Sequence, residues 1–352
     1  MSREPVRVGI VGAGANTRLR HIPGLREIDG VEIVGVVNRT PESTLRVAQE
    51  FKIPQTFATW QELVASPAID AVVIGTWPNM HCEVTCAALE AGKHVLCEAR
   101  MARDLAEARK MLAAANAHPN LVAQLVPSPF GLKCGPAVEG LLKSYYIGDL
   151  REAVVLGAND QFWDYSLPIH WRQDTALSGK NVLALGILHE TLMRWLPEPQ
   201  QVFAQSELFE PTRPQPNQNC FSDVTVPDSV QVLAELKGGV RAMYHMSGAI
   251  LFGPGMQIHL YGSRGTIKVQ FRGDEEIVLT GRAGDPELRP LQVSPEDQGC
   301  WQVEQDFVAA IRGELKQVTL TDFQSGVDYM EFTEAVSLSA ERHEAISLPL
   351  DA

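Results

Sequence analysis

The sequence has no apolar run long enough to cross a membrane, since a spanning helix needs about 18 or more consecutive apolar residues. Its first residues, MSREPVRVGIVGAG, also lack the basic segment, apolar stretch and small-residue cleavage site of a signal peptide. We therefore expect a cytoplasmic protein with no membrane partner.

Positive charge is scarce as well. The chain has 30 Lys and Arg residues against 43 Asp and Glu residues, so its formal net charge at pH 7 is -13. Nucleic-acid binding depends on clustered Lys and Arg side chains, which this composition does not supply. We therefore expect no nucleic-acid partner and a small molecule as the ligand.

Cysteine is too sparse and too scattered for a zinc site. Of the 6 cysteines, Cys82 and Cys86 lie close together, one helical turn apart and next to His81. Zinc usually takes four Cys or His ligands in closely spaced pairs. We expect no metal and interpret the cysteines as mostly buried, reduced thiols.

The first third of the chain alternates short apolar runs with longer helical patterns. The runs are too apolar to have one face in water, which is typical of parallel strands covered by helices on both sides. We predict an α/β Rossmann dinucleotide-binding domain over residues 1–126, with strands at 6–11, 31–37, 71–76, 95–97 and 121–126.

Prolines and glycines crowd together after Val126, and strand-like segments then dominate. The pattern predicts a second, α+β domain over residues 127–352 with a large, mostly antiparallel open sheet. The expected strands lie at 151–156, 201–208, 230–236, 240–246, 257–260 and 266–269.

A glycine turn follows the first predicted strand and opens a helix. Glycine allows a tight turn and a close approach of backbone N–H groups to a pyrophosphate, whose charge the start of a helix favours. Thr17 stands at the place of the third glycine. We predict that the turn binds a dinucleotide through Gly12, Gly14, Ala15 and Asn16.

The second predicted strand ends in Asn38-Arg39-Thr40. An NAD-binding domain usually has a carboxylate here for the ribose 2′-hydroxyl. An amide, a guanidinium and a hydroxyl suit a 2′-phosphate better, so we favour NADP(H) over NAD(H). The alternative is that Arg39 is a solvated turn residue.

Longer motifs resemble the Gfo/Idh/MocA (glucose-fructose oxidoreductase/inositol dehydrogenase) family over nearly the whole chain. The resemblance implies a Rossmann domain, a cofactor near Thr76, Trp77, Pro78 and His81, and an open sheet that forms a homodimer or homotetramer. Trp77-Pro78 could equally be a rigid turn. The motifs are residues 74–81, 87–98, 171–172, 178–179, 189, 261–266 and 306–312.

Two family positions are replaced. The family typically has Glu-Lys-Pro after a strand, where the lysine assists proton transfer at the hydroxyl being oxidised. Here Glu98 is followed by Ala99 and Arg100, and the resemblance implies that Glu98 and Arg100 bind the cofactor. The family also places an aspartate four residues before a histidine, and here Leu185 precedes His189. His189 is either a catalytic residue or a core histidine.

The resemblance implies an oxidoreductase acting on a sugar, cyclitol or related polyhydroxyl or carbonyl compound. Lys180 is then a candidate for the missing base, because lysine can be tuned by burial, whereas Arg100 stays protonated and could only orient substrate or stabilise charge near the cofactor. The alternative for Lys180 is a solvated loop residue. Trp171, Arg172, Lys180 and His189 are candidate substrate residues.

Arg172 could instead pair with Asp174, which would give it a structural role.

Two other functions stay open for the protein. The whole chain could be a catalytically silent NAD(P)-binding sensor or regulatory protein. It could also be a redox-neutral enzyme that uses its bound cofactor transiently.

Overall fold

The computed structural model describes residues 4–216 and 219–351. Contacts divide the chain into two compact units. The first runs to Pro127 and also takes in Gln302–Asp328, and the second comprises Ser128–Trp301 and the chain from Tyr329 on. The predicted division near residue 126 does not include the return of Gln302–Asp328 to the first unit.

A six-stranded sheet forms the centre of the first unit, with every neighbouring pair parallel. The strand order is β3-β2-β1-β4-β5-β6, which is the doubly wound order of a Rossmann fold. The strands are β1 (Val6–Val11), β2 (Val31–Val37), β3 (Gln55–Thr56), β4 (Ala71–Ile74), β5 (His94–Cys97) and β6 (Ala123–Leu125).

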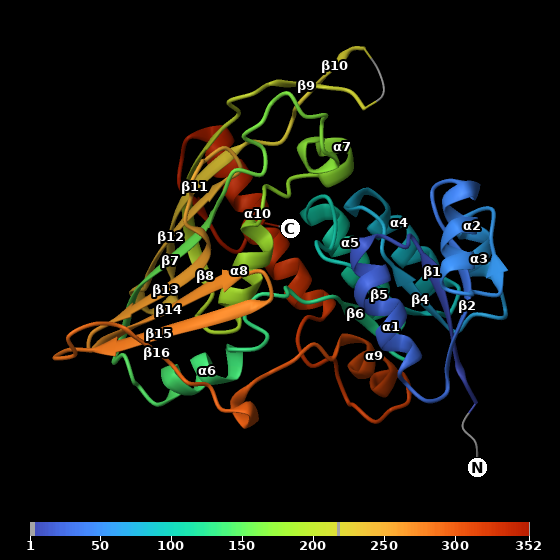
Figure 1. The fold of residues 1–352 in the computed structure, drawn as a ribbon, viewed down its shortest axis with the longest axis horizontal. Helices are drawn as coiled ribbons and strands as arrows, with labels where there is room; N and C mark the ends of the chain where they lie inside the picture. Colours follow the sequence, from blue (N-terminus) through green and yellow to red (C-terminus); the bar gives the residue numbers. More distant parts are fainter. Residues whose placement is uncertain (1–3, 217–218, 352) are drawn as a thin grey trace. The chain divides into compact units, whose positions relative to one another are not determined.

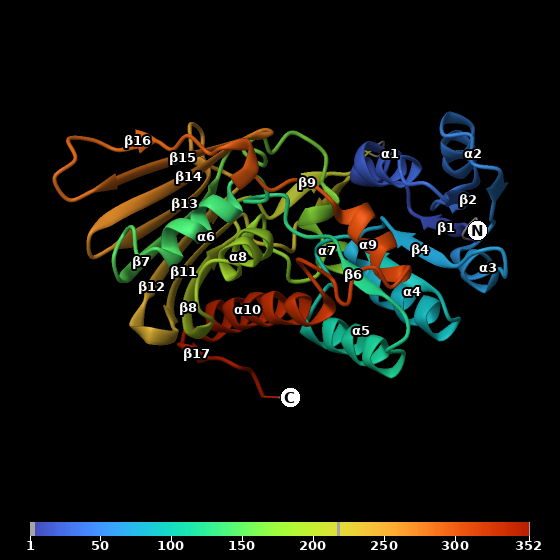
Figure 2. The same ribbon diagram turned by 90° about the horizontal axis from the view of Figure 1, so that it is seen from below.

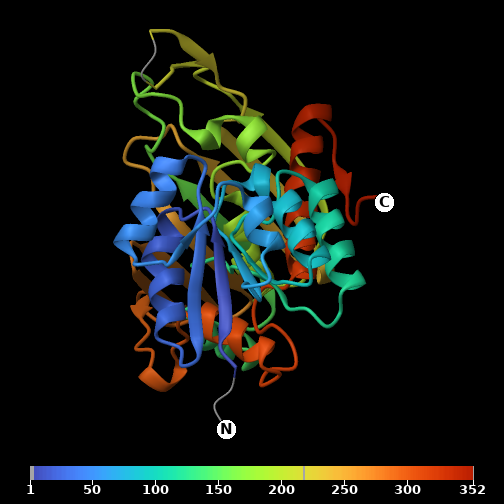
Figure 3. The ribbon, with the colours of Figure 1, turned by 90° about the vertical axis from the view of Figure 1, so that its right-hand side faces the viewer.

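Helices flank both faces of this sheet (Figures 1 and 3), which is why β4 is buried along its whole length. The predicted α/β class is therefore confirmed. The helices are η1 (Thr17–His21, a π-helical turn), α1 (Ile22–Arg26), α2 (Pro41–Glu50), α3 (Trp60–Ala65), α4 (Pro78–Glu90), α5 (Leu105–Ala117) and α9 (Val303–Ile311).

The returning segment pairs with the last strand of the first unit. Leu125 N–H donates to the carbonyl of Thr321 (3.1 Å), and Gln124 Nε2 donates to the carbonyl of Val303 (3.2 Å). The side chain of Gln124 is 3% exposed, so the second bond satisfies a buried amide nitrogen. Residues 302–328 are thus part of the Rossmann unit.

The second unit is built on a nine-stranded sheet, in the order β16-β15-β14-β13-β7-β12-β11-β8-β17. All neighbouring pairs are antiparallel except β12 and β7, which confirms the predicted sheet. The strands are β7 (Leu150–Ala158), β8 (Pro199–Glu207), β11 (Ser229–Leu236), β12 (Arg241–Ser247), β13 (Gly255–Gly262), β14 (Gly265–Arg272), β15 (Glu275–Arg282), β16 (Arg289–Pro290) and β17 (Ile346–Ser347).

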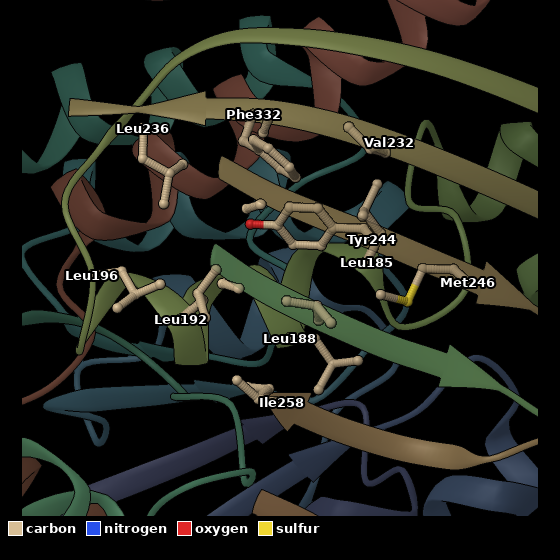
Figure 4. Packing of buried hydrophobic residues seen from close by; sticks show 14 of the residues in the cluster. Leu185, Leu188, Leu192, Leu196, Val232, Leu236, Tyr244, Met246, Ile258 and Phe332 are labelled. Carbon is tan, nitrogen blue, oxygen red and sulfur yellow. The ribbon is translucent and has the colours of Figure 1, made fainter. Parts of the chain in front are cut away.

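Helices cover one face of this sheet (Figures 1 and 2). They are α6 (Gly135–Lys143), α8 (Leu185–Met193) and the part of α10 (Phe323–Arg342) that belongs to this unit. Leucines of α8 and Phe332 of α10 pack against Tyr244 and Met246 of β12 (Figure 4). Smaller elements are η2 (Trp171–Gln173), α7 (Thr175–Ser178), β9 (Thr212–Pro214), β10 (Phe221–Asp223), η3 (Lys237–Gly239) and η4 (Pro295–Asp297).

Two further properties concern the described ranges as a whole. Within them, no helix combines the length and apolar character that a membrane span needs. The cysteines are free thiols; Cys82, Cys86, Cys97 and Cys134 are buried, whereas Cys220 and Cys300 are exposed.

Candidate cofactor and active site

The glycine turn after β1 packs closely against the loop after β4. Gly12 has a φ of +83°, and a Cβ atom there would lie 2.6 Å from Thr76 Cγ2 and 2.9 Å from Thr76 N. A Cβ on Gly14 would lie 3.0 Å from the carbonyl oxygen of Gly75. Gly12 needs glycine, since its φ is positive and a side chain there would push the two loops apart, whereas a side chain at Gly14 would require a small shift of its neighbour.

A helix starts directly after the turn, at Ala15 and Asn16. The first N–H groups of a helix have no partner within it, and they favour an anion such as pyrophosphate. Thr17, in place of the third glycine, is buried, and its hydroxyl donates to the carbonyl of Gly12 (3.4 Å). The threonine therefore supports the turn, and the cradle fits a dinucleotide phosphate.

Asn38, at the end of β2, shapes this turn. Ala13 N–H donates to Asn38 Oδ1 (2.7 Å), and Asn38 Nδ2 donates to the carbonyl of Ser43 in α2 (3.2 Å). Thr40 is the N-cap of α2, because its side chain accepts from Ser43 N–H (3.2 Å). Both side chains have structural roles beside their predicted cofactor roles.

Arg39 and Trp77 bring the ends of β2 and β4 together. The guanidinium carbon of Arg39 lies 5.1 Å from the centre of the Trp77 ring, which is a cation–π distance, and Arg39 is exposed. Trp77 precedes α4, and Pro78 is the first residue of that helix. An exposed guanidinium beside an aromatic ring can still offer its N–H groups to a phosphate.

His81, in α4, contacts the loops that follow β4 and β5. Its ring is fully buried, with Nε2 3.1 Å from the carbonyl oxygen of Thr76 and Nδ1 2.9 Å from that of Arg100. Burial lowers the pKa of His81. The histidine therefore joins the loops after β4 and β5, and its ring is enclosed by protein.

The loop after β5 carries the altered family motif. Glu98 accepts from Asn16 Nδ2 at 2.5 Å, so the glycine turn and the end of β5 are linked. Ala99 is partly buried, and Arg100 is 5% exposed. The methyl group of Ala99 can neither donate nor accept a proton.

Leu185 and His189 lie in the core of the second unit. Leu185 is fully buried in α8, and His189 is 2% exposed (Figure 4 shows the surrounding side chains). His189 stacks on Phe332 with ring centres 3.6 Å apart, and its Nδ1 lies 2.8 Å from the hydroxyl of Tyr244. Burial lowers the pKa of His189 to about 3, so it is neutral at pH 7 and a weak base.

Lys180 follows the turn made by Gly179, whose φ is +67°. Its ammonium forms an ion pair with Glu334 of α10, and the Lys180 side chain is 36% exposed. It is therefore not a solvated loop residue without a partner. The pair orients the lysine and keeps it within reach of solvent.

Arg172 stacks on Trp171, with its guanidinium carbon 4.3 Å from the ring centre. Asp174 caps α7 by accepting from Ala176 N–H (2.8 Å). Within the described ranges, no ion pair joins Arg172 to a carboxylate, so the alternative pairing with Asp174 is not formed. Burial lowers the pKa of Arg172.

His21 and Glu304 are site residues that the sequence pattern did not reveal. His21 lies in η1 between Glu98 and Glu304, with ring nitrogens 2.9 Å and 2.5 Å from their carboxylate oxygens. A histidine four residues into a helix gives no sign of such partners, and Glu304 is 283 residues away. A search of the described residues for three or more grouped His, Cys, Asp or Glu ligands finds no metal site.

Comparisons with known proteins agree with this architecture. Residues 6–125 match the model of an oxidoreductase family with an NAD-binding Rossmann fold, GFO_IDH_MocA, and residues 137–268 match the GFO/IDH/MocA C-terminal domain. An uncharacterized oxidoreductase, ORF334 of Rhizobium meliloti, is 27% identical over 206 residues, which are 58% of this chain and 60% of the relative.

Two further proteins are similar over more of their length. A dTDP-3,4-didehydro-2,6-dideoxy-alpha-D-glucose 3-reductase from Saccharopolyspora spinosa is 29% identical over 270 residues, 76% of this chain and 75% of the relative. The structure of a levoglucosan dehydrogenase in complex with NADH and L-sorbose has a TM-score of 0.87 at 19% identity, covering 99% of this chain and 100% of its own. The chain therefore belongs to the Gfo/Idh/MocA oxidoreductase family, with an NAD-binding Rossmann fold as its first unit and the family's C-terminal domain in its second.

Proposed function

We propose that this chain is an NADP(H)-dependent oxidoreductase acting on a sugar, cyclitol or related polyhydroxyl or carbonyl compound. The observation that carries the proposal is the phosphate cradle, in which Gly12 lies so close to Thr76 that no Cβ would fit and Gly14 lies against the carbonyl oxygen of Gly75. A bound nicotinamide supplies hydride acceptance or donation. The substrate class is supported by relatives that are named for a dideoxyglucose derivative and for levoglucosan.

Preference for NADP(H) is supported by the end of β2. The amide of Asn38 is engaged by the turn and α2, which leaves Arg39 exposed against Trp77. In fluorescence titrations we expect Arg39→Ala to weaken NADPH binding about tenfold and to leave NADH binding nearly unchanged, because a guanidinium–phosphate pair is lost. Arg39→Lys, which keeps the charge but not the fork, should fall between. Tighter binding of NADH than NADPH by the unaltered protein would contradict this preference.

Lys180 is our candidate for the proton-transfer group. His189 is too weak a base, with a pKa of about 3, and Arg100 stays protonated. Lys180 has an amine that Glu334 can hold in place while it donates a hydrogen bond to a substrate hydroxyl and relays its proton.

Lys180→Ala tests this role. We expect turnover to fall at least about 100-fold, since a positioned acid–base group contributes about that much, while NADPH affinity is unchanged. Glu334→Gln is the matched variant; it removes the charge that orients the amine and should lower turnover less. Full activity in Lys180→Ala would exclude the lysine as a surrogate base.

A cofactor-binding sensor is the second candidate function. It is favoured by Ala99, by the fully buried Leu185 and by the enclosed ring of His189, which together leave three family positions without a working acid–base group. A screen of polyols and carbonyl compounds for net NADPH formation or consumption separates the candidates. Cofactor binding without any turnover would favour the sensor, and product formed without net redox change would favour a redox-neutral enzyme.

We also propose that the chain forms a homodimer or homotetramer through the outer face of the nine-stranded sheet. Phe203, Leu233 and Met243 are direct cross-strand neighbours on β8, β11 and β12. All three side chains are exposed, with Leu233 at 60%. A row of exposed apolar side chains on an open sheet is typical of a surface that a partner covers.

A further inference from the structure

A chain of four hydrogen-bonded side chains runs through the Rossmann unit. Asn16 Nδ2 donates to Glu98 Oε1 (2.5 Å), the same oxygen lies 2.9 Å from His21 Nε2, and His21 Nδ1 lies 2.5 Å from Glu304 Oε1. His21 is 0% exposed, and the side chains of Glu304 and Glu98 are 1% and 14% exposed. We call these four residues the His21 chain.

The geometry fits a protonated His21. Both ring nitrogens face a carboxylate oxygen, and only an imidazolium has an N–H group on each nitrogen. Burial lowers the pKa of His21, but the hydrogen bonds and charges of Glu304 and Glu98 outweigh burial and raise it to about 9. Among the contacts that the structure describes, the carboxylates that face His21 are that of Glu98, directly after β5, and that of Glu304 on α9.

Glu98 gains a fixed charge and a fixed direction from this arrangement. Burial raises the pKa of its carboxyl, but the hydrogen bonds from His21 and Asn16 and the charge of His21 leave that pKa below its ordinary value. Glu98 ends β5, beside the helix that starts at the glycine turn. A buried carboxylate with two donors on one oxygen has little freedom to turn.

We propose that His21 and Glu304 are positioning residues that hold Glu98 as an oriented carboxylate for the nicotinamide cofactor. The inference rests on the proposed function, in which Glu98 is a cofactor residue. Glu304 is supplied by the segment that returns to the Rossmann unit, so the cofactor site depends on both ends of the chain.

Loss of the His21 proton breaks the arrangement. A neutral imidazole has one N–H group, so it can donate to Glu98 or to Glu304 but not to both. The second carboxylate then faces a lone pair in a buried site, which is unfavourable. Above pH 9, Glu98 therefore loses the charge of His21 and is held less firmly, although Asn16 and the N–H group of Ala99 still donate to it, and cofactor affinity falls.

The test is the pH dependence of NADPH dissociation, measured by fluorescence titration from pH 7 to pH 10. For the unaltered protein we expect affinity to fall about tenfold through pH 9, the effect of losing one charged hydrogen bond. His21→Gln should bind about tenfold more weakly at pH 7 and show no such step. Glu304→Gln should move the step to lower pH, because one of the two carboxylates that raise the pKa of His21 is gone.

Asp70→Asn is the matched control. It removes an ion pair with Arg7 in the same unit, and Asp70 has no contact with the His21 chain. We expect it to keep the step seen in the unaltered protein. An unchanged step in His21→Gln or Glu304→Gln would overturn the positioning role, whereas absence of NADPH and NADH binding at every pH would remove the proposed function and this role with it.

A second measurement needs no variant that might fail to fold. In NMR titration of the imidazole resonances of the unaltered protein without cofactor, we expect one histidine to titrate near pH 9. If every histidine titrates below pH 7, His21 is not paired with two carboxylates in solution and the proposal is wrong.

Discussion

The family resemblance assigns Ala99, Leu185 and His189 to positions of the acid–base group, and two of them, Leu185 and His189, are buried in the second unit. Leu185 is fully buried and His189 stacks on Phe332. Lys180, paired with Glu334, has a hydrogen-bonding amine and partial exposure to solvent. At the scale of single residues, chemistry in this protein therefore depends on whether Lys180 has taken over the role that Ala99 cannot fill.

The first prediction concerns His189. Its folded-state pKa is about 3, against 6.5 ordinarily, so the unfolded chain takes up a proton first as pH falls. The stability that results is fully present above pH 6.5 and is lost as pH drops towards 3. In urea unfolding, we expect the unaltered protein to lose about 1 kcal/mol more than His189→Phe between pH 7 and pH 5.5. An imidazole NMR signal of His189 that titrates between pH 6 and 7 would contradict this.

The second prediction concerns His21, whose contribution to stability changes with pH in the opposite direction to that of His189. Its pKa is raised in the folded state, so its contribution to stability is fully present below pH 6.5 and is lost as pH rises through about 9. We expect the melting temperature of the cofactor-free protein to fall between pH 7 and pH 10, and to fall less in His21→Gln. Equal slopes for the two proteins would mean that His21 does not titrate in this range.

At the scale of elements, the residue at the start of a helix can affect both the stability of that helix and the binding of the cofactor. Thr40 caps α2 and Thr59 caps α3 in the same way, by accepting from the N–H group three residues later. The two threonines differ in place, because Thr40 follows Arg39 at the predicted 2′-phosphate position. A comparison of Thr40 with Thr59 therefore distinguishes the effect of helix capping from an effect on cofactor binding.

The third prediction uses this pair. Thr40→Ala and Thr59→Ala should each lower the free energy of unfolding by about 1 kcal/mol, the usual effect of losing an N-cap. We expect weaker NADPH binding in Thr40→Ala alone, and Thr40→Ser should restore both properties. Equal NADPH affinity in the two alanine variants would limit Thr40 to its capping role.

The sequence predicts the elements that depend on residues close together in the chain, and it does not predict contacts between distant residues. β4 is a continuous apolar run, β1 and β2 are mostly apolar, and Thr40-Pro41 is a local helix start, so all were predictable. β3 has two exposed residues, and the apolar run of β15 is only three residues long and follows two glutamates, so neither strand was predicted. The glycine turn was predicted, but Glu304 was not, because its contact with His21 spans 283 positions.

The fourth prediction belongs to the whole molecule and tests the assembly proposed for the open sheet. Leu233→Glu places a charge in the centre of the row formed with Phe203 and Met243, where burial against a partner would leave it unpaired. We expect sedimentation or light scattering to show smaller assemblies. Phe252→Glu, at a side chain fully exposed on the loop between β12 and β13, should leave the assembly intact. A monomer in the unaltered protein would exclude the interface.

The return of residues 302–328 has a consequence for how the protein is made. Ribosomes deliver the glycine turn, His21 and Glu98 early, but Glu304 and Thr321 are synthesised only after eight of the nine strands of the second unit's sheet, all except β17. Until then His21 lacks one of its carboxylates and the edge of β6 is uncovered. The nascent Rossmann unit must wait for residues 302–328 before it can mature.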